Sequence, residues 1–279
     1  NGKWAAVFGN GYDSDTGDAG LFIVYLDGSG HVYLPTGVGS TDDQNGLSTP
    51  AIVDSDLDGT IDRVYAGDLR GNMWAFDVES TVPGQWTVET TSGTSTPLFT
   101  ISGQAITGAP LVARNTANEN GAAPNLLVTF GTGQYLTDTD TSNTAASGFY
   151  AVSDNGNYGK TTSNLESRAL NTRTVEGVSH RTLSGNAIDW TTKSGWYIPL
   201  QSGVSGDGGE WVGGERVVTR PDLLRNILFF NTLIPTGAVC SAGGYGWMMS
   251  VDVRTGLAPE KHAIYDANGD GEIDSADMG

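Results

Sequence analysis

The sequence is poor in positive charge, cysteine and long apolar runs, and each shortage excludes a class of protein. It has 14 Lys and Arg residues against 32 Asp and Glu residues, for a formal net charge of −18. This charge disfavours nucleic acids and anionic membrane surfaces as partners, because each phosphate approached would add Coulomb repulsion. No apolar run approaches the ~20 residues of a membrane-spanning helix, so we expect no direct membrane insertion.

The cysteine and histidine residues form no recognisable catalytic constellation. The single cysteine, Cys240, cannot form an internal disulfide, and we interpret it as a small buried hydrophobic residue. The histidines His31, His180 and His262 are scattered, and no hydrolase constellation surrounds them. The carboxylates cluster only in two loops, where a metal ion would neutralise them. We therefore expect no enzyme activity.

Glycine is abundant, and this favours an all-β protein. The chain has 40 glycines among its 279 residues and many Thr, Ser and Asn residues, a composition typical of short strands and tight turns. With 38% hydrophobic residues, the chain can fill a sizeable core. Asn1 directly precedes a strand-like run, Lys3–Phe8, so we expect the segment to belong to a longer polypeptide. The acidic composition suits an exported protein.

The first of two acidic loops runs from Asp54 to Asp62. It places side-chain oxygens at loop positions 1, 3, 5 and 9, a glycine at position 6 and a backbone carbonyl at position 7, which is the ligand order of a calcium loop. Without a metal its carboxylates would repel one another. The alternative interpretation is an acidic solvated turn. The predicted ligands are Asp54, Asp56, Asp58, the Thr60 carbonyl and Asp62.

The second acidic loop lies near the end of the sequence. It continues to a carboxylate at position 12, as in loops of EF-hand and dockerin type. The first loop has Tyr65 at that position, so Asp62 must close the first site alone. Oxygen ligands in flexible loops favour Ca²⁺ over Mg²⁺ or Zn²⁺. The predicted ligands of the second loop are Asp266, Asn268, Asp270, Glu272, Asp274 and Asp277.

One strand pattern recurs along the chain with irregular spacing. An apolar strand ends in a glycine-rich or polar turn, and a second strand with aromatic residues ends at an aspartate. Such repeats are typical of a β-propeller, although a β-sandwich with long hairpins also fits. We expect further blades before Asn1, unless the insertions hold further strands. The paired strands are expected within 4–11 and 21–27, 63–71 and 72–77, 125–133 and 148–154, and 226–232 and 246–252.

The remaining sequence divides into shorter strands, long loops and a C-terminal segment. Additional strands are expected at 49–53, 108–112 and 216–222, and we expect the tryptophans to pack between blades. The segments 79–107, 137–147 and 153–195 are rich in Ser, Thr, Gly and Asn, which predicts long loops on the propeller faces. We assign the β-propeller to residues 1–258 and a calcium-loop segment to residues 259–279.

At its strand pairs the sequence resembles the C-terminal propeller domain of the PilY1 family of type IV pilus biogenesis factors and tip-associated adhesins. The similarity runs in family order over nearly the whole chain. The matching stretches are Trp4–Tyr12, Asp54–Asp77, Val128–Leu136, Gly195–Leu200, Gly214–Val218 and Leu233–Trp247.

The resemblance implies a fold, a metal site and a role. The fold would be a modified, quinoprotein-like propeller of seven blades at the end of a large secreted adhesin. The Asp54 loop would bind calcium and regulate pilus extension versus retraction, and hence twitching motility. The implied partners are major or minor pilin subunits of the pilus and ligands on host cells or surfaces. The implied location is extracellular or at the cell surface, on the pilus, after export through the periplasm and outer membrane.

Two other functions fit parts of the sequence. A quinoprotein dehydrogenase shares the strand rhythm and calcium, but its repeated docking pattern survives here only as a fragment, Asp252–Gly256, and adjacent cysteines are lacking. An extracellular glycan-binding or integrin-like propeller would carry the calcium loop in several successive blades, whereas here one blade has it. The predicted function is therefore a calcium-binding, non-catalytic module of a pilus biogenesis factor.

Overall fold

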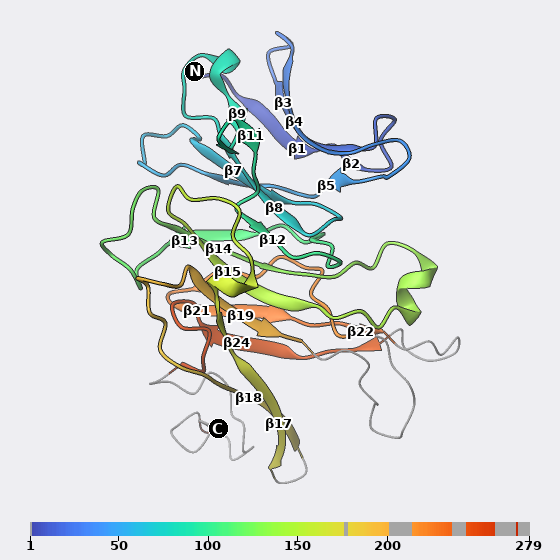
Figure 1. The fold of residues 1–279 in the computed structure, drawn as a ribbon, viewed down its shortest axis with the longest axis vertical. Helices are drawn as coiled ribbons and strands as arrows, with labels where there is room; N and C mark the ends of the chain where they lie inside the picture. The colour runs from blue at the N-terminus through green and yellow to red at the C-terminus, as the bar shows by residue number, and fades with distance from the viewer. Residues whose placement is uncertain (1, 176–177, 201–213, 236–243, 260–271, 273–279) are drawn as a thin grey trace.

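The computed structural model describes residues 2–175, 178–200, 214–235, 244–259 and 272. Within this part of the chain, the secondary structure consists of β-strands and short 3-10 helices. The larger sheets follow one another in chain order along the long axis of the molecule (Figure 1). Among the described residues, no helix is long and apolar enough to cross a bilayer.

Two antiparallel sheets form the N-terminal half of this stack. The first has the strand order β1-β3-β4, and the second has the order β12-β8-β7-β6, with β9 also paired to β8. The central strands β7 and β8 are buried along almost their whole length, because packed elements cover both faces of the second sheet. The strands are β1 (Ala5–Gly9), β3 (Asp18–Tyr25), β4 (His31–Gly39), β6 (Ala51–Val53), β7 (Arg63–Gly67), β8 (Asn72–Asp77), β9 (Thr87–Val88) and β12 (Phe99–Thr100).

Two further sheets continue the stack. The third has the order β13-β14-β15-β19-β16, and the fourth has the order β20-β21-β24. Their pairings are antiparallel except for β16 with β19. The strands are β13 (Leu111–Arg114), β14 (Leu126–Gly131), β15 (Gly148–Asp154), β16 (Glu166–Ser167), β19 (Gly195–Pro199), β20 (Asp222–Leu224), β21 (Ile227–Asn231) and β24 (Met248–Asp252).

Short two-stranded ladders and 3-10 helices lie outside the four larger sheets. Two-stranded ladders join β2 with β5, β10 with β11, β17 with β18 and β22 with β23. Their bounds, with those of the 3-10 helices, are β2 (Gly11–Tyr12), β5 (Gly46–Leu47), β10 (Thr90–Thr91), β11 (Thr94–Ser95), β17 (Ala169–Val175), β18 (Val178–Ser184), β22 (Ile234–Pro235), β23 (Gly244–Tyr245), η1 (Pro83–Gln85), η2 (Asp138–Ser142) and η3 (Thr162–Asn164).

A hydrophobic cluster fills each interface between successive sheets. Leu21 and Trp74 belong to the cluster between the first and second sheets, and Tyr65 and Phe130 belong to the next. Between the third and fourth sheets, the rings of Phe149 and Phe230 stack with centroids 3.9 Å apart. Each cluster contains buried aromatic side chains, which make the interface a large apolar contact. These clusters hold the sheets face to face.

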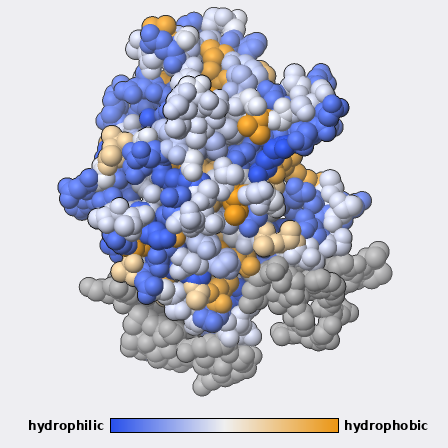
Figure 2. All heavy atoms as spheres, in the orientation of Figure 1, coloured by the Kyte–Doolittle hydropathy of each residue, from blue (hydrophilic) through white to orange (hydrophobic). Residues whose placement is uncertain are grey.

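Two expectations about the fold need correction. Trp74 and Trp196 are buried as predicted, but Trp4 is 85% exposed because it precedes the edge strand β1 of the first sheet. The segments 79–107 and 153–195 contain more than loops: β9 to β12 lie in the first, and the second contains the hairpin β17–β18, whose strands pair over seven residues each. The molecular surface is mainly hydrophilic on the face in Figure 2, with apolar residues in small separate groups.

Candidate metal centre

The Asp54 loop leaves the second sheet after β6 and returns to it at β7. Val53 pairs with Arg63 in the antiparallel register, so residues 54–62 form a closed excursion from the strand pair. The backbone N–H of Asp62 donates to the carbonyl of Val53 at 2.9 Å, which ties the base of the loop. The loop therefore projects from the strand pair of the partly exposed β6 and the buried β7.

Three of the predicted ligands come together in this loop. One carboxylate oxygen each from Asp54, Asp56 and Asp58 can be chosen so that all three atoms lie within 4.8 Å of one another. Asp54 organises the turn, because its Oδ1 accepts the N–H of Leu57 at 2.7 Å and its Oδ2 accepts that of Gly59 at 2.9 Å. The three carboxylates therefore face a shared space, and the oxygen-only donor set fits a hard cation.

Leu57 and Gly59 adopt the left-handed backbone that this sharp turn requires. Their φ angles are 66° and 91°. Glycine adopts this conformation without steric cost, whereas Leu57 does so at a cost that the surrounding hydrogen bonds offset. The glycine at loop position 6 thus serves the turn, as the sequence pattern predicts.

The carboxylate of Asp58 is held in its charged form. It accepts hydrogen bonds from the hydroxyl of Thr60 at 2.6 Å and from the backbone N–H of Thr60 at 2.7 Å. These bonds lower the pKa of Asp58, because they stabilise the carboxylate over the protonated acid. Asp58 is therefore ionised at neutral pH and available to a cation.

Asp62 lies apart from the other three carboxylates. It is 5% exposed, and its Oδ2 accepts hydrogen bonds from the backbone N–H and the hydroxyl of Ser55 at 2.6 and 2.7 Å. It is not part of the close group of Asp54, Asp56 and Asp58. The sequence pattern did not indicate this role of Ser55, at loop position 2. The spacing of the carboxylates predicts which residues could bind a metal, but not which neighbouring side chain orients them.

The loop also contacts the third sheet. The guanidinium of Arg114, the last residue of β13, donates to the carbonyl of Ser55 at 3.2 Å. Just below the loop, Arg63 lies 2.7 Å from Glu89 and 3.6 Å from Asp154 of β15. These contacts join residues far apart in the sequence, and no local pattern indicates them.

The second predicted calcium loop lies almost wholly outside the described residues. Of its predicted ligands, Glu272 alone is described, and it is exposed. The other five predicted ligands are not among the described residues: Asp266, Asn268, Asp270, Asp274 and Asp277. Cys240, His262 and Trp211 also lie outside the described residues.

Known proteins match both the sequence and the fold of this chain. The PilY1 beta-propeller domain family matches residues 1–186. A type IV pilus biogenesis factor PilY1 homolog from Xylella fastidiosa is 31% identical over 292 residues, which cover 92% of this chain and 18% of that protein. The type IV pilus biogenesis factor PilY1 of Pseudomonas aeruginosa is 28% identical over 99% of this chain and 26% of its own length.

A solved structure supports the same assignment. The crystal structure of the Pseudomonas aeruginosa PilY1 C-terminal domain has a TM-score of 0.77 and 27% sequence identity to this chain, and the match covers 98% of this chain and 60% of that one. The chain thus spans about a quarter or less of the full-length relatives. The stacked sheets are blades of a β-propeller, and the chain belongs to the PilY1 β-propeller family.

Proposed function

We propose that this chain is a calcium-binding, non-catalytic module of a type IV pilus biogenesis factor. The observation that carries the proposal is the group of Asp54, Asp56 and Asp58, whose carboxylate oxygens lie within 4.8 Å of one another in a loop with the ligand order of a calcium site. Relatives that share almost the whole of this chain are named type IV pilus biogenesis factors.

Each of these loop residues would supply a different oxygen ligand to the ion. Asp54, Asp56 and Asp58 supply charge, and the carbonyl of Thr60 supplies a neutral oxygen. Asp62 uses one carboxylate oxygen to hold Ser55 and offers the other to the ion. Calcium tolerates irregular coordination by six to eight oxygens, so the site would need Asp62 to move toward the group of Asp54, Asp56 and Asp58 on binding. We expect a dissociation constant of roughly 10⁻⁶ to 10⁻³ M, the range of oxygen sites in flexible loops.

Binding would bias the loop between two states. With calcium the loop is pinned against β7, and without it the carboxylates repel and the loop loosens. A ligand at a hundredfold excess over its Kd stabilises the state that binds it by about 2.7 kcal/mol. This free energy is enough to shift a surface contact with pilin subunits while the core stays folded. In this way the module would regulate pilus extension against retraction, and hence twitching motility and adhesion at the cell surface.

Calorimetric titration with calcium tests the metal site. Asp56→Asn is the informative variant, because it removes one charge, keeps the size of the side chain and retains an oxygen for the N–H of Asp58. We expect its affinity to fall by roughly tenfold or more. Asp42→Asn is the matched control, since Asp42 is exposed and lies outside the loop. Equal affinities in both variants would rule out the proposed coordination.

A second experiment tests the regulatory role in the full-length protein. Asp62→Ala should fold and be exported but change the number of surface pili or their retraction. Asp62→Lys places a cation near the carboxylates and should imitate the calcium-bound state in part. Normal pili and normal twitching in both strains would mean that calcium only stabilises the fold.

The C-terminal loop should bind calcium independently of the Asp54 loop. The two loops are separated by more than two hundred residues and use different closing ligands, Asp62 and Asp277. Distant sites with no shared partner contribute additively. Removing either loop should therefore leave the binding isotherm of the other unchanged.

A further inference from the structure

Ser55 contacts the third sheet as well as Asp62. Its backbone N–H and its hydroxyl both donate to Oδ2 of Asp62, at 2.6 and 2.7 Å, and its carbonyl accepts the guanidinium of Arg114 at 3.2 Å. All three polar groups of Ser55 are therefore hydrogen-bonded. Through them Ser55 links a predicted metal ligand to Arg114, the last residue of β13.

The bond between Arg114 and Ser55 crosses the junction between the second and third sheets. The Asp54 loop follows β6, an edge strand of the second sheet, and Arg114 belongs to β13, an edge strand of the third sheet. These two edge strands lie beside each other. Arg114 is exposed, so water can replace Ser55 as the partner of its guanidinium at little cost.

Arg114 brings a positive charge to a strongly acidic loop. The loop contains four carboxylates and no Lys or Arg. In the absence of a metal ion, a guanidinium hydrogen-bonded to the loop reduces the repulsion among these carboxylates. The same guanidinium would be repelled by a dication in the loop. The charge of Arg114 therefore favours the metal-free form.

The strengths of the bonds at Ser55 decide which of them breaks when Asp62 moves. To ligate calcium, Asp62 has to approach the group of carboxylates from which it lies apart. Two short, partly buried bonds to a carboxylate tie Ser55 to Asp62, whereas one longer, exposed bond ties it to Arg114. Ser55 should therefore follow Asp62 and lose its bond to Arg114.

We propose that Arg114 holds the Asp54 loop to the third sheet in the metal-free chain and releases it when calcium binds. This inference rests on the proposed function, and it names what the calcium site would regulate: the junction between the second and third sheets. Coupling between two binding events is reciprocal. A bond that breaks on calcium binding must therefore lower the affinity for calcium while it is intact.

Calorimetric titration of Arg114→Gln with calcium tests this coupling. The variant lacks the guanidinium, and we expect it to bind calcium roughly three- to fivefold more tightly than the parent. Arg220→Gln is the control, because it makes the same charge change at an exposed residue outside the loop and should bind as the parent does.

The titrations separate failure of this inference from failure of the proposed function. If the parent binds calcium and Arg114→Gln binds it no more tightly, the coupling is overturned while the calcium site stands. An equal gain in both variants also overturns it, because the effect would then come from net charge alone. A parent that binds no calcium overturns both the site and the coupling.

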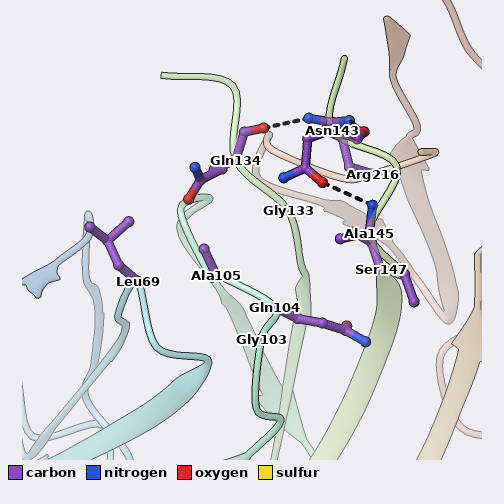
Figure 3. Close-up of a pocket in the computed structure, with 11 residues that line it drawn as sticks. Leu69, Gly103, Gln104, Ala105, Gly133, Gln134, Asn143, Ala145, Ser147 and Arg216 are labelled. Carbon is purple, nitrogen blue, oxygen red and sulfur yellow. Dashed lines mark hydrogen bonds between the residues drawn. The ribbon is translucent and has the colours of Figure 1, made fainter. Parts of the chain in front are cut away.

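Nitrogen-15 NMR of the arginine side chains follows the release directly. We expect the guanidinium signal of Arg114 to shift on addition of calcium, with a midpoint at the calorimetric Kd. Arg216 is the internal reference, because its guanidinium is buried and donates to backbone carbonyls such as that of Gln134 (Figure 3). The signal of Arg216 should not move. An Arg114 signal unchanged at saturating calcium would overturn the proposal.

Discussion

The hydroxyl of Tyr65 in β7 donates a 2.7 Å hydrogen bond to Asp154 in β15, and both side chains are fully buried. The bond joins the second and third sheets directly below the Asp54 loop. Burial and the neighbouring carboxylate together raise the pKa of Tyr65, so the phenol keeps its proton. A buried carboxylate needs such donors because its desolvation is costly, and Asp154 therefore fixes how the two sheets sit against each other.

Tyr65→Phe should destabilise the chain by about 1–3 kcal/mol, because it leaves the buried carboxylate of Asp154 with one donor fewer. Urea denaturation measures the change in the free energy of unfolding. Tyr135→Phe removes the same hydroxyl from an exposed side chain and should have little effect. Equal losses in the two variants would show that the inter-sheet bond contributes nothing.

Asp68→Asn should destabilise the chain by roughly 3 kcal/mol or more. The buried carboxylate of Asp68 accepts the indole N–H of Trp74 at 2.9 Å and the amide groups of Asn45 and Asn72 at 3.0 and 2.8 Å. All three donors bind Oδ2 of Asp68. An amide N–H₂ group in place of this oxygen could not accept their hydrogen bonds. Asp77→Asn is the matched control, because the carboxylate of Asp77 accepts a single bond near the surface. Thermal melting of both variants gives the comparison.

Lys160 should make stability rise with pH between about 8 and 10. Its side chain is buried and donates to the carbonyl of Asn157, and burial lowers its pKa from 10.5 to about 8, against the opposing charge of Asp154. In this window the unfolded chain holds the proton and the folded chain does not, so raising the pH favours the folded state. The cost of burying the charged form is present in full below the folded pKa.

Lys160→Met should abolish this rise. The measurement is the free energy of unfolding across the same pH range for the parent, this variant and Lys193→Met, whose ammonium bonds a carbonyl at the surface. Buried tyrosines with raised pKa values lower the stability as the pH rises further, and they do so equally in all three proteins. The difference in slope between the parent and Lys160→Met therefore reports Lys160 alone. A slope unchanged by Lys160→Met would contradict the assignment.

Ser55→Ala should weaken calcium binding by roughly tenfold, because Asp62 loses the hydroxyl that orients its carboxylate. Ser55→Thr keeps the hydroxyl and should bind nearly as the parent does. Both variants should unfold at the same temperature in the presence of a chelator, which separates an effect on the metal from an effect on the fold. Parental affinity in Ser55→Ala would show that the hydroxyl is dispensable.

The strand pairs that surround tight turns could be predicted from the sequence. β7 and β8 fall within 63–71 and 72–77, and β14 and β15 fall within 125–133 and 148–154, as expected from apolar runs that end in glycine. The hairpin β17–β18 was not predicted, because Thr, Asn and Ser dominate its strands and only isolated apolar residues such as Leu170 and Leu183 reach the core.

Part of the candidate site could be predicted for a local reason. The spacing of Asp54, Asp56 and Asp58 within five residues is enough to bring their oxygens together around a glycine turn. Contacts between sheets depend on the whole fold, so neither Arg114 beside Ser55 nor Asp154 beside Tyr65 has a sequence signal.

The hydrogen bonds that shape the Asp54 loop arise almost entirely within it, from Asp54, Asp58 and Ser55. A mutation at an exposed carboxylate such as Asp56 therefore leaves the strands beneath untouched. One or two substitutions among these carboxylates would therefore remove the proposed metal site without unfolding the blades. With the calcium site proposed above, metal binding would thus be separable from the architecture, and two chains with the same blades would differ in it through this loop alone.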